Sequence, residues 1–164
     1  SGQVLEKMAG TAEEKAARRA SVFTALVASP MGGSPGYAAD RLYLSLPSAA
    51  PDEFLKLEES LCLARPDDKW LILAFVRTHA AAEAWPAVLA RTSAALSAEK
   101  PARGSAWAPL MELQTLALEK SGRPPAAREI LEACARLPAS GGDTEGHRIS
   151  EAAMARLIQR LRPN

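Results

Sequence analysis

From residue 51 onward, apolar residues recur at helical spacing and are interrupted at short intervals by proline and glycine. Apolar residues three and four positions apart fall on one face of an α-helix, so this pattern predicts amphipathic helices. Proline favours the first turn of a helix and glycine favours the position after its end, so both mark boundaries. The predicted helices begin near Pro51, near Pro66, at Trp85, at Ala106, at Ala126 and near Ile149. Because the connections are short, consecutive helices should run antiparallel.

The composition predicts the same fold class. Of 164 residues, 34 are alanine and 21 are leucine, whereas aromatic residues make up 5%. Alanine and leucine are strong helix formers, and the β-branched and aromatic residues that favour strands are scarce. We therefore predict an all-α protein whose antiparallel helical hairpins stack as a short array or as a helical bundle.

The first 50 residues differ in pattern from the rest of the chain. Thr11 and Glu14 have the spacing of a capping box, which predicts a helix running to about residue 28. Proline and glycine then dominate residues 29–36, and a short helix is expected over residues 37–46. We predict an N-terminal helix over 1–28, a Gly/Pro-rich linker with a short helix over 29–50, and a helical-hairpin domain over 51–164 that ends in a capping helix.

Residues 107–138 carry spaced large and small residues on two predicted helices. The positions on the first helix are Leu110, Leu113, Gln114 and Ala117, and those on the second helix and its end are Ala126, Ile130, Ala133 and Pro138. This spacing resembles a tetratricopeptide-type repeat. Leu110 and Ala117 stand where that family usually has a tryptophan and an aromatic residue. The resemblance implies one helical hairpin of an array, with an inner groove lined by first-helix side chains.

The resemblance also implies which residues would bind a partner. In the matched unit, the groove positions are Ala108, Met111, Thr115, Leu118 and Glu119. In the preceding hairpin, they include Lys69 and Arg77, two cations that could hold a peptide carboxylate. The alternative is that Lys69 and Arg77 are solvated surface charges.

We predict a protein–protein interaction module, a scaffold or adaptor that binds a partner helix or peptide in a helical groove. One alternative is a helical enzyme with a carboxylate or thiol in a pocket. A second is an RNA-binding helical repeat, and the basic cluster of Arg156, Arg160 and Arg162 could serve it. The net charge of +1 makes a nucleic-acid partner unlikely on electrostatic grounds. Those arginines also fall in the last turns of the final helix, where they would complement its dipole.

The sequence predicts no catalytic residues, cofactor or metal. Cys62 and Cys134 lie among apolar residues, which favours two buried reduced thiols over a disulfide. His79 and His147 lack the spacing of a zinc site. No apolar run approaches the ~18 residues of a membrane span. These features lead us to expect a cytoplasmic protein, and the sequence leaves the oligomeric state open.

Overall fold

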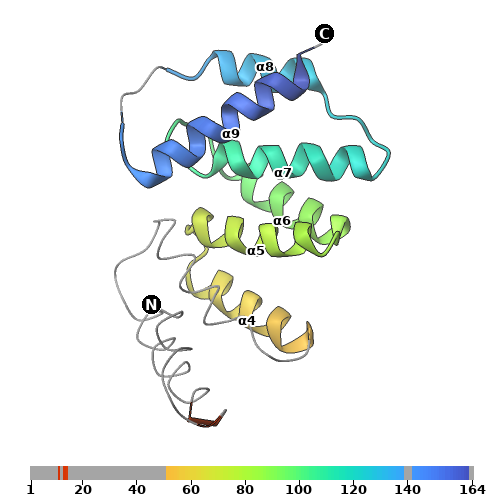
Figure 1. Cartoon of the computed structure of the whole chain (residues 1–164), viewed down its shortest axis with the longest axis vertical. Coiled ribbons are helices and arrows are strands. Elements are labelled where there is room, and N and C mark those ends of the chain that lie inside the picture. The colour runs from red at the N-terminus through yellow and green to blue at the C-terminus, as the bar shows by residue number, and fades with distance from the viewer. Residues whose placement is uncertain (1–10, 12, 15–50, 139–141, 163–164) are drawn as a thin grey trace. The chain divides into compact units, whose positions relative to one another are not determined.

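The computed structural model describes residues 11, 13–14, 51–138 and 142–162, and every regular element in them is an α-helix (Figure 1). The all-α prediction is therefore confirmed. The helices from residue 51 onward are α4 (Pro51–Ala64), α5 (Lys69–Ala81), α6 (Trp85–Ser97), α7 (Trp107–Lys120), α8 (Ala127–Ala135) and α9 (Glu145–Leu161). Across the described helices, none combines the length and the apolar character needed to cross a membrane.

The chain divides into two compact units, Ser1–Ala74 and Phe75–Asn164, so the division falls within α5. The N-terminal prediction is tested at one point, where the backbone N–H of Glu14 donates to Thr11 Oγ1 at 3.2 Å. That contact confirms the capping interaction. The remainder of the predicted helix to residue 28, the linker and the short helix lie outside the described residues, and their boundaries stay predictions.

Helix boundaries follow local chemistry that is visible in the sequence. Asp68 Oδ1 accepts a hydrogen bond from the backbone N–H of Leu71 at 3.0 Å, which caps the start of α5. At the end of α7, Gly122 adopts a φ of +72°, a conformation that glycine tolerates without steric cost. The N–H of Arg123 then donates to the carbonyl of Leu118 at 2.8 Å, which satisfies a carbonyl of the last turn.

Helix α9 starts about four residues earlier than we predicted, at Glu145 rather than near Ile149. Thr144 is its N-cap, and its Oγ1 accepts a hydrogen bond from the backbone N–H of His147 at 3.1 Å. Gly146 led us to extend the loop, because glycine weakens a helix interior. In the structure Gly146 is buried in the first turn, where the cap stabilises the helix.

In the second unit, α7 packs against α6 and α9, and α8 packs against α9 (Figure 1). One core cluster joins the last three helices, and its buried members are Trp107, Ala108, Cys134, Leu137, Ala153 and Met154. Consecutive helices α7 and α8 are not a closely packed pair. Two prolines at 124 and 125 separate them, and proline favours extended backbone before it, so α8 does not turn straight back onto α7. The tetratricopeptide resemblance of residues 107–138 stays a prediction.

Candidate binding groove between α8 and α9

The face of α7 that we predicted to line a groove is the face against which α9 packs. Ala108 and Thr115 are fully buried, and Met111 packs against the core cluster. Thr115 Oγ1 donates to the carbonyl of Glu112 at 2.8 Å and accepts from Arg160 Nη1 at 3.3 Å. The structure thus brings these residues together as a helix–helix interface within the chain. Their role in binding a partner stays a prediction.

Ion pairs join α7 and α9 at the polar edge of this interface. Arg156 holds Glu112 through two hydrogen bonds, Nε to Oε2 at 2.7 Å and Nη2 to Oε1 at 3.0 Å. One turn further along α9, Arg160 Nη2 donates to Glu119 Oε2 at 2.8 Å. The hydrogen bond that Arg156 donates to Glu112 raises the pKa of Arg156 above its ordinary value. We predicted that these arginines complement the helix dipole, and the structure shows in addition that Arg156 and Arg160 have specific partners on α7.

The three other predicted binding residues lie on α5 and α7. Leu118 is half-buried on α7. Lys69 is half-buried at the start of α5 in the first unit, whereas Arg77 is exposed in the second unit. Partial loss of hydration lowers the pKa of Arg77, the carboxylate of Glu112 raises it, and the positive charge of Arg156 lowers it further. A joint role for Lys69 and Arg77 in holding a carboxylate therefore stays a prediction.

An open groove of about 730 Å³ runs between α8 and α9. Three residues of α8, each one turn from the next, form one wall, and three residues of α9 form the other. They are Ala127, Leu131 and Ala135 on α8, and Met154, Ile158 and Leu161 on α9. The beginning of α8 faces the end of α9, so the two walls run antiparallel. The lining is mainly apolar, and its volume is within the range of about 300–1,000 Å³ that is typical of ligand sites.

Helix α8 has apolar residues beyond those that pack against the core. Cys134 belongs to the core cluster, and Ile130 and Ala133 pack against it. Leu131 is half-buried as well, and it lines the groove. A helix with one buried stripe normally has a polar opposite face, so a second apolar stripe indicates a second contact.

Charged side chains surround the apolar lining. Three arginines and one glutamate contribute to the groove: Arg103, Arg128, Arg162 and Glu132. Arg128 Nε donates to Glu132 Oε1 at 2.9 Å, and the Arg128 side chain is 92% exposed, so this pair is a weak surface contact. Arg162 is exposed and forms no ion pair with any residue in the described ranges. The groove is therefore apolar within, and among the described residues Arg162 is the one arginine of its edge that has no ion pair.

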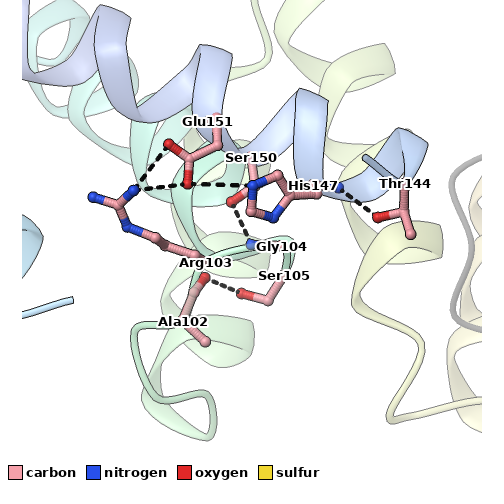
Figure 2. Close-up of polar contacts among 8 residues, drawn as sticks. All are labelled: Ala102, Arg103, Gly104, Ser105, Thr144, His147, Ser150 and Glu151. Carbon is pink, nitrogen blue, oxygen red and sulfur yellow. Dashed lines mark hydrogen bonds and ion pairs between the residues drawn. The ribbon is translucent and has the colours of Figure 1, made fainter. Parts of the chain in front are cut away.

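A polar cluster fixes Arg103 at the edge of the groove, and Figure 2 shows its members. Arg103 Nη1 lies 3.2 and 3.3 Å from the two carboxylate oxygens of Glu151 on α9. The neighbouring Gly104 donates its N–H to the buried Ser150 Oγ at 3.2 Å, and His147 Nε2 lies 3.9 Å from Glu151. Two contacts with α9 thus anchor the loop before α7. Nothing in the sequence pairs residues this far apart, so sequence reasoning missed the cluster.

The groove contains one group with possible covalent chemistry, the thiol of Cys134. Desolvation by burial raises the pKa of Cys134, and the positive charge of Arg103 only partly offsets this effect. A protonated thiol is a poor nucleophile, so the environment does not activate Cys134. Neither cysteine forms a disulfide, and the described residues include no group of three His, Cys, Asp or Glu side chains placed to hold a metal ion.

Comparison with known proteins gives no relative: no family model, no curated protein and no solved structure matches this chain.

Proposed function

We propose that this chain is a protein-interaction module that binds a segment of a partner protein in the groove between α8 and α9. The observation that carries the proposal is the open groove itself, whose apolar walls are half-buried at Leu131 and Ile158 and whose floor is formed by buried core residues such as Met154. Contiguous exposed apolar surface is unfavourable in water, and in a folded protein it commonly marks an interaction site. The proposal keeps the predicted mode of binding and moves the binding surface from α7 to α8 and α9.

The enzyme alternative has less physical support at this site. A thiol enzyme needs a lowered cysteine pKa and a base within hydrogen-bond reach. Burial instead raises the pKa of Cys134. For RNA, a basic surface should follow the strand, yet here the charges border an apolar lining. Burial of apolar partner side chains fits this lining better than either alternative.

A photo-crosslinking amino acid placed at Leu131 tests the proposal directly in source cells. The matched control carries the same amino acid at Gln159, which is exposed on α9 and does not line the groove. We expect a discrete protein adduct from position 131 and none from position 159. Mass spectrometry of the adduct then identifies the partner segment, which is synthesised as a peptide for binding measurements.

The peptide supplies the decisive comparison. Leu131→Glu places a charge in the apolar lining and should raise the Kd of the peptide at least about tenfold. Gln159→Glu adds the same charge outside the groove and should change Kd less than about twofold. Circular dichroism checks that both variants remain helical. The absence of adducts, equal adducts at both positions, or equal Kd values for the two variants would each overturn the proposal.

A further inference from the structure

We infer that the occupant of the α8–α9 groove is an amphipathic helix of a partner protein that carries acidic residues at both ends of its apolar face. This inference rests on the proposed function, because it specifies what the groove binds. It follows from the hydrogen-bonding capacity of the walls, their length, and the placement of their charges.

The walls favour a helix over an extended peptide. Both walls are α-helical, so their backbone N–H and C=O groups are used within α8 and α9, apart from the helix ends. An extended segment would bring unpaired backbone groups against an apolar lining, which is unfavourable. A helix satisfies its own backbone and presents only side chains to the groove.

The length of the walls limits the length of the contact. Helix α8 has nine residues, which corresponds to about 12 Å along its axis. A partner helix would therefore contact the groove over about two turns, with apolar residues at positions i, i+3 or i+4, and i+7. The residues just outside this stretch would lie beside the charged edges of the groove.

Cations stand at both ends of the groove. At the end of α8 that holds Cys134, Arg103 is 27% exposed and uses Nη1 for Glu151. Its Nε is buried and has no acceptor among the described residues. At the opposite end, Arg162 follows Leu161 of α9 and is exposed. On the partner helix, a carboxylate beside Arg162 would form a new ion pair, and a carboxylate beside Arg103 would share that arginine with Glu151, because charge-assisted hydrogen bonds from arginine are strong and geometrically specific.

Selection from a display library of random 16-residue peptides tests the inference without a known partner. The full chain is the target, and the Leu131→Glu variant removes peptides that bind elsewhere. We expect the selected peptides to have apolar residues at helical spacing flanked by Asp or Glu, and to become helical when they bind. Selected peptides rich in proline or β-branched residues would refute the inference that the occupant is a helix. Basic or neutral residues beside the apolar positions would refute the inference that its ends are acidic.

A charge reversal with a matched control completes the test. Arg162→Glu should raise the Kd of a selected acidic peptide about three- to tenfold, with a smaller effect at high salt. Arg148→Glu changes the net charge equally but lies in the first turn of α9, outside the groove lining. Equal effects of the two variants would refute specific pairing with Arg162.

The two proposals fail in different ways. If position 131 still gives adducts while the selected peptides are extended or basic, the groove binds a partner but the acidic helix is wrong. If the selection yields nothing that distinguishes the chain from Leu131→Glu, the acidic helix is also wrong. Loss of the position-specific adducts, or loss of the Leu131→Glu effect on the captured segment, removes the groove itself.

Discussion

Glu112 lies where two arginines compete for one carboxylate, and this arrangement predicts an asymmetric mutational response. Its two hydrogen bonds with Arg156 form a bidentate pair in which the side chains are 20% and 53% exposed. An exposed pair contributes about 0.2–1 kcal/mol, and bidentate geometry places this one near the upper limit. Arg77 is close enough for both charges to shift its pKa. Removing Glu112 therefore loses the pair and also the attraction that offsets the repulsion between Arg77 and Arg156.

The magnitudes follow from these contacts. Glu112→Gln should lower the free energy of unfolding by about 1.5 kcal/mol: about 1 kcal/mol from the lost pair with Arg156 and about 0.5 kcal/mol from the lost attraction to Arg77 in nearly water-like surroundings. Arg156→Gln should lower the free energy of unfolding by only about 0.5 kcal/mol. This variant loses the pair, but it also removes the repulsion between Arg156 and Arg77 and leaves Glu112 available to Arg77. The double variant that combines Arg77→Gln with Glu112→Gln should regain about 0.5 kcal/mol of the free energy of unfolding, because Arg77 no longer repels Arg156.

Urea unfolding at pH 7, followed by circular dichroism, measures all three variants against the parent chain. The difference between Glu112→Gln and Arg156→Gln should shrink in 1 M NaCl, because salt screens exposed charges. Equal costs for the two single variants, or a larger cost for Arg156→Gln, would refute the competition. A triplet that is insensitive to salt would show that packing, and not charge, determines the response.

Four further predictions follow from single contacts. Thr144→Ala removes the N-cap of α9 and should lower the free energy of unfolding, measured with urea, by about 1 kcal/mol. Leu110→Ala truncates a fully buried side chain and should lower the same quantity by about 2–5 kcal/mol. At Gly142 a methyl group would lie 3.0 Å from the ring of His147, so Gly142→Ala should destabilise the start of α9, measured as faster amide exchange there. Alkylation of Cys134 should be slow at pH 7 and accelerate only above the ordinary thiol pKa. The thiol ionises at a lower pH in the unfolded chain than in the folded chain, so the free energy of unfolding should fall as the pH rises above the ordinary thiol pKa. A free energy of unfolding that rises over these pH values would contradict the raised pKa of Cys134.

The helices could be predicted from the sequence because their signals are local. Apolar spacing, the cap at Asp68 and the glycine at Gly122 act within a few residues of the backbone they control. The start of α9 could not be placed equally well. A glycine in the first turn counted against the helix, whereas the Thr144 cap and the burial of Gly146 stabilise it.

The candidate site was less accessible to sequence reasoning. Ala127, Leu131 and Ala135 are spaced by four residues in the sequence, which places them on one face of a helix. This spacing is the signal that could have indicated a second apolar face on α8. The same residues fit equally well on a stripe that faces the core. Which stripe faces the core depends on how neighbouring helices pack.

The sequence by itself determined that this protein is helical and where most of its helices begin and end, because propensity, capping and turn chemistry are properties of neighbouring residues. Only the tertiary structure decided that α9, and not α8, lies along α7, and that an open groove with a mainly apolar lining forms between α8 and α9. Several amphipathic helices can bury their apolar faces in more than one pairing. The choice among pairings depends on side-chain fit and on charge pairs such as Arg156 with Glu112, which join residues 44 positions apart.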